Sequence, residues 1–315
     1  MAYQRRIYTQ FGTFDLMAGE LQEKQDAGAC APLAVVMISL NEAHNMDAVL
    51  ENLSGFAQQI FLVDSYSIDA TIDIALKHGI HVVQRRFRNF GDQWNFALAK
   101  LPITEPWTMK LDPDERLTDE LKASIRAAII AKQADGFTVI RRLWFMNRPL
   151  PVRQKILRVW KTGACRFSDV LVNEHPIVNG RTIEIDGDLE HYDSPHLHHW
   201  FDKQNHYTTA EALSSWRGDR LSALPRLFGN KLERRMWLKD RLHKSELGPT
   251  AVFLYNVFVL HVWRAGRVGM AWAHLRAEVT RWRLYKRKEL DLLGRDYKVL
   301  QPNAGKPDPR VPQFE

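Results

Sequence analysis

Runs of apolar residues alternate with helically spaced apolar positions through the first half of the chain. Continuous apolar runs, typical of buried strands, predict strands at 33–39, 57–63, 80–84, 107–111 and 137–142. Apolar residues three or four positions apart predict helices between them, at 45–53, 71–78, 92–100 and 118–134. This alternation predicts an α/β fold, with a mostly parallel sheet flanked by helices.

The pattern changes after residue 142. Residues 143–195 contain Gly, Pro and Asn with short β-like pieces and predict an irregular region, and the spacing at 200–213 predicts a helix. From about residue 221, Arg and Lys interleave with Trp, Phe and Leu, which predicts a basic and aromatic helical appendage at the C-terminus. We therefore divide the chain into a tail (1–31), a main domain (32–220) and a helical region (221–315).

The composition is that of a folded protein that favours anionic partners. Hydrophobic residues make up 45% and charged residues 26% of the 315 positions, and the formal net charge is +7. The beginning of the chain has no apolar signal-peptide core, and no apolar run approaches the roughly 20 residues that cross a bilayer. Cys30 and Cys165 stand too far apart for a zinc motif. We expect a cytoplasmic protein whose partner is a nucleotide, a nucleic acid or an acidic membrane surface.

Acidic and amide residues follow three of the predicted strands. Asn41 and Glu42 follow the first, Asp64 follows the second, and Asp112 and Asp114 follow the fourth. In an open α/β sheet, ligands bind at the carboxyl ends of the strands, and no glycine-rich phosphate loop follows the first strand here. Two carboxylates on one side of an extended chain suit Mg²⁺ or Mn²⁺ shared with substrate phosphates. Taken singly, each of these residues is also an ordinary cap or turn residue.

Four motifs stand in order along the same part of the chain: ISLNEAHN at 38–45, VDSYSIDAT at 63–71, FGDQWNFA at 90–97 and LDPDE at 111–115. Together they resemble family 2 glycosyltransferases, inverting enzymes of the GT-A fold, and most of all the branch with lipopolysaccharide-core β-1,4-glucosyltransferases. The resemblance covers about residues 33–215 and implies a nucleotide-sugar half at 32–142 and an acceptor half at 143–220. The second motif departs from the family at Tyr66, Ile68 and Ala70, which replace small or hydroxyl residues.

The resemblance also implies roles for particular residues. Asp114 would hold the cation, Mg²⁺ or Mn²⁺. Apart from the resemblance, His191 in the segment 189–192 is a candidate to reach the diphosphate or the cation, with a structural role as the alternative. The nucleotide-sugar would be bound by six side chains, namely Asn41, Glu42, Asp64, Gln93, Asn95 and Asp112.

An inverting transfer needs a general base to remove the proton of the acceptor hydroxyl. Residues 172–175 stand where the related enzymes carry a Val-His-Glu type element, and the resemblance thus favours Glu174 as this base, with His175 and Glu115 as rival candidates. The alternative for Glu174 is a salt-bridged glutamate at the surface. The later group His196, His198 and His199 follows a proline in a loop-like stretch, and we expect it at the surface rather than in a metal site.

The resulting hypothesis is an inverting, cation-dependent hexosyltransferase that moves one sugar from a nucleotide-sugar, most simply a UDP-hexose. Its acceptor would be a lipid-linked glycan, lipopolysaccharide or exopolysaccharide at the cytoplasmic face of the cell membrane. Aromatic residues with basic neighbours in 221–315 favour peripheral contact with an anionic membrane surface, and no nucleic acid is expected. An alternative interpretation of the same composition is that these helices pack against the main domain. The alternative function is a non-catalytic nucleotide-sugar or nucleic-acid binder, which would need no base.

Overall fold

The computed structural model describes residues 30–168, 175–218, 226–229, 233–234, 237, 241, 245–296 and 305–314. Its first half consists of β1 (Ala31–Ser39), α2 (Ala43–Leu53), β2 (Ala57–Asp64), α3 (Thr71–Lys77), β3 (His81–Arg85), α4 (Phe90–Lys100), β4 (Trp107–Lys110), β5 (Glu115–Leu117), α5 (Asp119–Ala131) and β6 (Gly136–Phe145). All the strands and helices predicted in this half are confirmed, with ends that shift by no more than three residues.

The second half contains more regular structure than its sequence predicts. It comprises β7 (Arg148–Lys161), β8 (Cys165–Phe167), β9 (Pro176–Val178), β10 (Thr182–Tyr192), α6 (Leu197–Arg217), α8 (Gly248–Leu254), the π-helix η1 (Tyr255–Val259), the 3₁₀-helix η2 (Val262–Ala265), α9 (Gly266–Leu293) and β11 (Gln313–Phe314). The expectation of an irregular 143–195 is wrong for β7 and β10. Charged side chains interrupt the apolar pattern of β7 because they form ion pairs with β10, as Arg153 does with Asp188.

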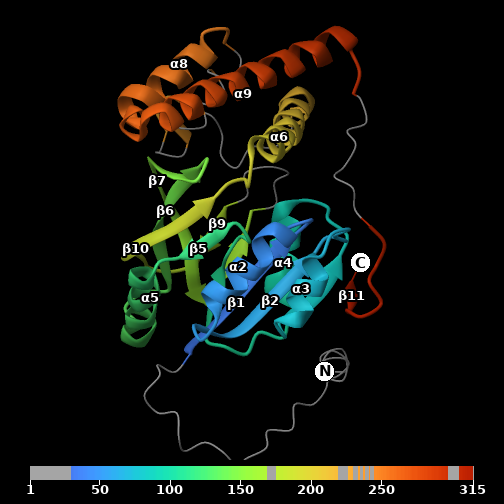
Figure 1. The fold of residues 1–315 in the computed structure, drawn as a ribbon, viewed down its shortest axis with the longest axis vertical. Helices are drawn as coiled ribbons and strands as arrows, with labels where there is room; N and C mark the ends of the chain where they lie inside the picture. The colour runs from blue at the N-terminus through green and yellow to red at the C-terminus, as the bar shows by residue number, and fades with distance from the viewer. Residues whose placement is uncertain are drawn as a thin grey trace, which may run out of the picture.

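One large sheet carries the fold (Figure 1), in the strand order β11-β3-β2-β1-β4-β7-β6-β10-β5. The neighbours β3, β2, β1 and β4 are all parallel, whereas β7 runs antiparallel to both β4 and β6. The carboxyl ends of β2, β1 and β4 therefore lie side by side. The expected mostly parallel α/β sheet is confirmed.

Side chains alternate between the two faces of the sheet. On β1, Leu33, Val35 and Met37 belong to a core that is covered by α2, α3 and α5. The intervening Ala34 and Val36 face a second core, which includes Trp94 of α4 and Phe167 of β8. Burial on both sides explains why β1 is a continuous apolar run.

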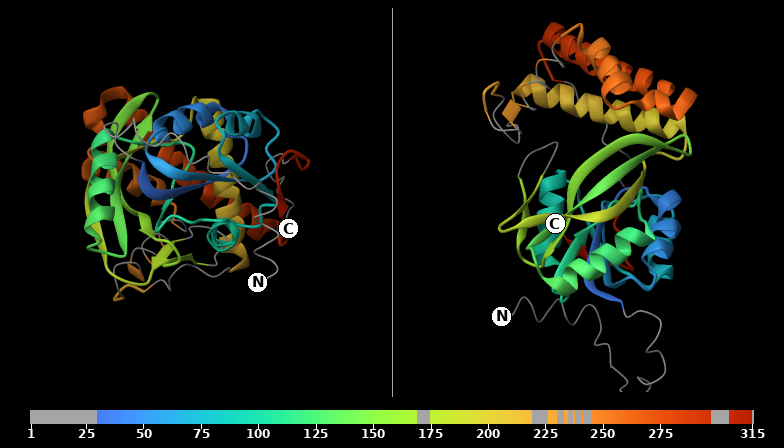
Figure 2. Two further views of the ribbon diagram at one scale, coloured as in Figure 1. Left: turned by 90° about the horizontal axis from the view of Figure 1, so that it is seen from below. Right: turned by 90° about the vertical axis from the view of Figure 1, so that its left-hand side faces the viewer.

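The C-terminal helices pack on one end of the sheet domain (Figures 1 and 2). The β6–β7 hairpin extends toward them, and Phe145 near its tip packs with Trp200 of α6 and Trp272 of α9. The two-residue turn at the tip has positive φ at both Met146 and Asn147, 47° and 55°, as tight hairpins require. The expected helical appendage is confirmed, and it shares a hydrophobic core with the hairpin.

At its end the chain departs from the expected helical region 221–315. Strand β11 pairs in parallel with β3, at the edge of the sheet. The backbone N–H of Gly305 donates to the carbonyl of Tyr66 (2.6 Å), and that of Asp308 donates to Oε1 of Gln84 (2.6 Å). Two strand residues are too few for a recognisable pattern, which is why the sequence did not reveal this return. At the other end, Ala31 of the expected tail already lies in β1, and residues 1–29 lie outside the described residues.

No helix in the described ranges combines the length and the apolar character that crossing a bilayer requires.

Candidate active site

The carboxyl ends of β1, β2 and β4 form one edge of the sheet, which we call the rim. Asp64 lies beneath this rim at the end of β2. Its fully buried carboxylate accepts hydrogen bonds from Ser39 Oγ (3.0 Å), from the Ser67 backbone N–H (2.9 Å) and from Gln84 Nε2 (2.9 Å). These bonds fix the loop after β2 against the end of β1. The structure thus places Asp64 at the predicted rim, where it holds the loop. Its contact with a nucleotide stays a prediction.

Asn41 connects the same loop to the segment after β1. Its backbone N–H donates to Ser67 Oγ (2.7 Å), and its Oδ1 accepts from the Ile68 N–H (2.8 Å). This position has a φ of 58°, in the left-handed region that Asn tolerates better than most residues. The strained backbone is thus stabilised by contacts between two rim loops.

Glu42 is a carboxyl group that the site keeps partly protonated. Burial is the largest cause, and the negative charge of Asp114 adds to it, so that the pKa of Glu42 rises to about 7. A hydrogen bond from Asn45 Nδ2 (2.9 Å) favours the charged form and opposes this shift.

Gln93 and Asn95 of α4 support the rim from behind. The fully buried Gln93 donates from Nε2 to Ser65 Oγ (3.3 Å). Asn95 accepts from the Phe167 N–H (2.8 Å) and donates to the Phe167 carbonyl (3.0 Å). Both side chains therefore position backbone or side-chain groups near the predicted nucleotide site, and their direct contact with a nucleotide stays a prediction.

The acidic motif after β4 is a turn and not an extended segment, because the Glu115 N–H donates to the carbonyl of Asp112 (2.9 Å). Asp112 and Asp114 were expected on one side only for an extended chain, and the turn removes this condition. Asp112 accepts from Lys110 Nζ (2.9 Å) and Arg158 Nη2 (3.0 Å). Burial alone would raise the pKa of Asp112, but these two cations outweigh it and lower the pKa to about 2. Asp114 turns toward other partners.

Glu115 lies in the interior. It is fully buried, and its carboxylate accepts from Arg158 Nη2 (2.5 Å) with Arg141 Nη1 at 3.5 Å. A carboxylate that neutralises a buried arginine has no path to an acceptor hydroxyl. The structure therefore argues against Glu115 as the base.

Asp114 belongs to a compact group of charged side chains. Its Oδ2 lies 3.2 Å from His191 Nε2 and 3.2 Å from Lys203 Nζ, and the same ammonium lies 3.1 Å from Oδ1 of Asp193. Burial opposes ionisation of Asp114, but His191 and Lys203 more than compensate and keep its pKa well below the ordinary value. In turn, Asp114 and Asp193 raise the pKa of the partly buried Lys203 well above that of a free lysine, against the effect of burial.

Three members of this group fit a divalent cation. One ligand atom from each of Asp114, His191 and Asp193 lies within 4.8 Å of the others. Two carboxylate oxygens and one imidazole nitrogen are donors that suit Mn²⁺, and the carboxylates suit Mg²⁺ as well. Sequence reasoning named Asp114 and His191, which the structure brings together, but it missed Asp193 and Lys203. The His191-x-Asp193 spacing at the end of β10 was a usable signal for Asp193.

The remaining base candidates are only partly described. Glu174 lies outside the described residues. The His175 N–H donates to Ser168 Oγ (3.0 Å) on the segment next to β9. In the later histidine group, the side chain of His196 caps α6 by accepting from the His199 N–H (3.2 Å), and His198 is exposed.

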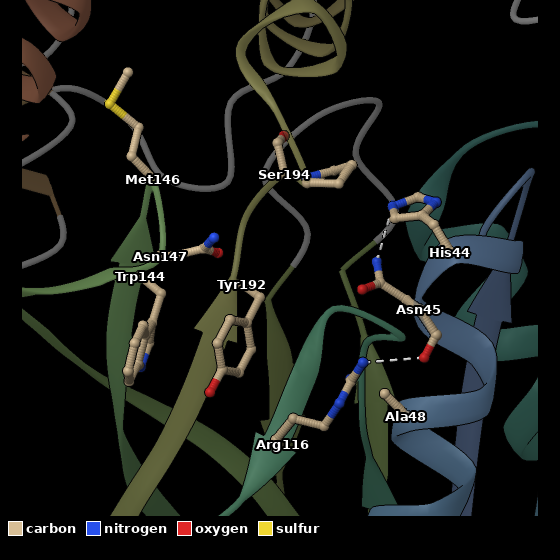
Figure 3. Close-up of a pocket in the computed structure, with 10 residues that line it drawn as sticks. His44, Asn45, Ala48, Arg116, Trp144, Met146, Asn147, Tyr192 and Ser194 are labelled. Carbon is tan, nitrogen blue, oxygen red and sulfur yellow. Dashed lines mark hydrogen bonds between the residues drawn. The ribbon is translucent and has the colours of Figure 1, made fainter.

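A cavity of about 370 Å³ opens beside the charged group (Figure 3). Trp144 and Tyr192 line one side, His44 and Asn45 of α2 line the other, and Arg116 rises from β5 between them. The Tyr192 N–H donates to the Asp114 carbonyl (2.8 Å), so the cavity adjoins the candidate cation site. The sequence singled out neither Arg116 nor this aromatic pair.

Comparison with known proteins gives one family and several relatives. The family model described as Glycosyl transferase family 2 matches residues 34–201. The lipopolysaccharide core biosynthesis glycosyltransferase LpsC of Rhizobium meliloti (strain 1021) is 26% identical over 278 residues, which are 82% of this chain and 94% of LpsC. Among solved structures, residues 1–349 of S. aureus TarS in complex with UDP are 14% identical with a TM-score of 0.43, covering 86% of this chain and 94% of that TarS segment. Mannosyltransferase PcManGT from Pyrobaculum calidifontis, in complex with GDP-Man and Mn²⁺, is 14% identical with a TM-score of 0.47, covering 86% and 90%.

Proposed function

The chain belongs to glycosyl transferase family 2, and from this premise we propose that it moves one sugar from a UDP-hexose to a lipid-linked or lipopolysaccharide-type acceptor. The reaction would be inverting and would depend on a divalent cation. The observation that carries the proposal is the group of Asp114, His191 and Asp193, which stands next to the carboxyl ends of the parallel strands. The similarity to LpsC over most of the chain supports the acceptor class.

Each part of the site has a task in this proposal. Asp114, His191 and Asp193 would hold Mg²⁺ or Mn²⁺, and a bound cation neutralises negative charge on the departing diphosphate. Lys203 supplies a further positive charge at the same place. Asp64 holds the rim against which the nucleotide would lie.

The proposed base remains Glu174, which would take the proton of the acceptor hydroxyl. Glu174→Gln should bind the donor as well as the natural protein does but lose transfer, because an amide does not accept that proton. Equal rates of transfer in both proteins would remove Glu174 from the mechanism.

The overall reaction is tested with a panel of radiolabelled nucleotide-sugars and glycolipid extracted from bacterial envelopes. With Mn²⁺ present, label from one donor should appear in the lipid fraction, and EDTA should abolish the incorporation. Incorporation that EDTA leaves unchanged would exclude a cation-dependent transfer.

Membrane contact is proposed for the apolar surface of η1, η2 and the end of α8. Phe258 is 65% and Trp263 51% exposed, and Leu254, Tyr255 and Val259 beside them are exposed as well. Arg264 and Arg267 follow directly and are also exposed. An apolar surface with basic residues at its margin is typical of protein segments that lie in the interface of an anionic bilayer. In Figure 1 these helices lie at the end of the molecule away from β1 and β2.

Vesicle flotation tests this contact. Removal of residues 226–315 is unsuitable, because the segment packs on the β6–β7 hairpin and returns to the sheet as β11. Phe258→Ser with Trp263→Ser should instead lose flotation with phosphatidylglycerol vesicles, whereas Ile130→Ser, at an exposed position on α5, should float normally. If the double variant floats as well as the natural protein, this surface does not bind the membrane.

A further inference from the structure

Arg116 is a partly buried cation in the wall of the cavity, held by backbone carbonyls and not by an acid. Its Nη1 donates to the carbonyls of Pro113 (2.6 Å) and Glu115 (2.7 Å), and its Nη2 donates to that of Asn45 (3.0 Å). Within the described part of the chain, we find no carboxylate at ion-pair distance from it, whereas Arg158 is paired with two. Three bonds use three of its five N–H donors, so the guanidinium retains two donors, and Asp114 and Glu42 act on its charge only from beyond ion-pair distance.

An aromatic wall stands next to this cation. Trp144 and Tyr192 are partners in the register of β6 and β10, and their rings stack with centroids 5.1 Å apart and planes 28° apart. The indole N–H of Trp144 donates to Glu190, which fixes the ring. Figure 3 shows both rings on the side of the cavity that faces Arg116 and α2. Aromatic side chains with a few directed polar groups are the usual lining of a site for a small organic ligand.

The cavity adjoins both the predicted nucleotide site, where its lining residue Asn45 donates to Glu42 (2.9 Å), and the candidate cation site. Its lining comes from α2, β5, β6, the hairpin turn and the end of β10, and not from β2 or β3, which hold the Asp64 loop. Its link to the centre is the backbone bond from Tyr192 to Asp114. A ligand in the cavity would therefore lie beside the donor and not in its place.

We propose that this cavity binds the acceptor through an anionic saccharide unit, with its phosphate or carboxylate on Arg116 and its ring against Trp144 and Tyr192. Arginine suits either group, because its planar guanidinium matches the geometry of both oxyanions. The apolar C–H face of a sugar ring has the shape and polarity to lie on the aromatic wall. This inference rests on the proposed function, because it names the substrate class of the same site.

The test measures thermal stabilisation of the full chain by four probes at equal concentration, with and without UDP and Mn²⁺. The probes are glucose 6-phosphate, glucuronate, methyl glucoside and inorganic phosphate. We expect at least one of the two anionic sugars to raise the melting temperature more than methyl glucoside and inorganic phosphate do. No rise with either anionic sugar, or an equal rise with methyl glucoside or with phosphate alone, would overturn the inference. Stabilisation by UDP with Mn²⁺ is read in the same samples, so failure of the donor site is recognised separately.

Variants locate the effect. Arg116→Gln should weaken binding of the effective anionic sugar by ~10- to 100-fold, the usual loss when a charged hydrogen-bond donor is removed. Trp144→Ala should weaken the same sugar and leave inorganic phosphate unchanged, and it keeps the test valid if Arg116→Gln folds poorly. Arg181→Gln, at an exposed position just before β10, is the matched control and should bind as the natural protein does. Unchanged sugar binding in a folded Arg116→Gln or in Trp144→Ala would refute the assignment.

Discussion

Replacing Glu42 by glutamine is expected to stabilise the ligand-free protein at alkaline pH. Burial and the charge of Asp114 raise the pKa of Glu42 from 4.5 to about 7. Between these two values the folded state binds a proton that the unfolded chain has released. The free energy of unfolding therefore falls as pH rises through this window. The stability associated with the protonated Glu42 is fully present only below pH 4.5.

The size of the effect follows from the two pKa values. One pKa unit corresponds to about 1.4 kcal/mol, so the raised pKa of Glu42 lowers the free energy of unfolding, relative to a side chain that stays uncharged in both states, by about 3 kcal/mol at pH 8 and by about 1 kcal/mol at pH 5. Glutamine does not titrate, and its amide oxygen still accepts the hydrogen bond from Asn45. Glu42→Gln should thus exceed the natural protein in stability by these amounts.

Urea unfolding at pH 5 and pH 8, in EDTA, measures the difference directly. Glu51→Gln, at an exposed position of α2, is the control and should change stability by less than about 0.5 kcal/mol at either pH. A stability gain of Glu42→Gln that is the same at both pH values, or a loss at pH 8, would refute the reasoning. Addition of Mn²⁺ should reduce the difference in free energy of unfolding between Glu42→Gln and the natural protein at pH 8. The reason is that a cation beside Asp114 offsets the negative charge that disfavours ionisation of Glu42.

Two further predictions concern the charged groups behind the rim. Lys203→Met should bind Mn²⁺ about tenfold more tightly, as measured by calorimetry without nucleotide. The reason is that the ammonium group that bridges Asp114 and Asp193 no longer competes with the ion. Weaker binding would show instead that Lys203 assists the metal. Glu115→Ala should lower the free energy of unfolding by about 3–5 kcal/mol, because Arg158 keeps only Asp112 as a counter-charge. Urea unfolding measures this difference. A loss below about 1 kcal/mol would contradict the structural role of the Glu115 carboxylate.

The sheet was predictable where the chain buries both faces of a strand. The continuous apolar residues of β1 lie between two cores, and a run of this kind needs no tertiary information to recognise. Strand β7 was missed because its polar residues satisfy partners on another strand, as Lys155 does with Glu184 (2.7 Å). Strand β11 was missed because it has only two residues and is defined by its partner β3. Both depend on contacts between segments far apart in the sequence.

The candidate site likewise has features that the sequence could predict and features that it could not. The positions of Asp64 and Asp114 at one rim followed from strand order, since parallel neighbours end together. The directions of the side chains did not follow, because a turn after β4 separates the partners of Asp112 from those of Asp114. Lys203 had no sequence signal, since one lysine in an amphipathic helix resembles any other until the fold places it between two carboxylates.

Asp114 is proposed to anchor the cation that binds the donor diphosphate, and calorimetry of UDP with Mn²⁺ tests this role most directly. The natural protein and Asp186→Asn, changed at an exposed position of β10, should bind UDP only when Mn²⁺ is present. Asp114→Asn, shown to be folded by its circular dichroism, should lose this Mn²⁺-dependent binding. Binding of UDP by folded Asp114→Asn with unchanged affinity and unchanged Mn²⁺ dependence would contradict the account.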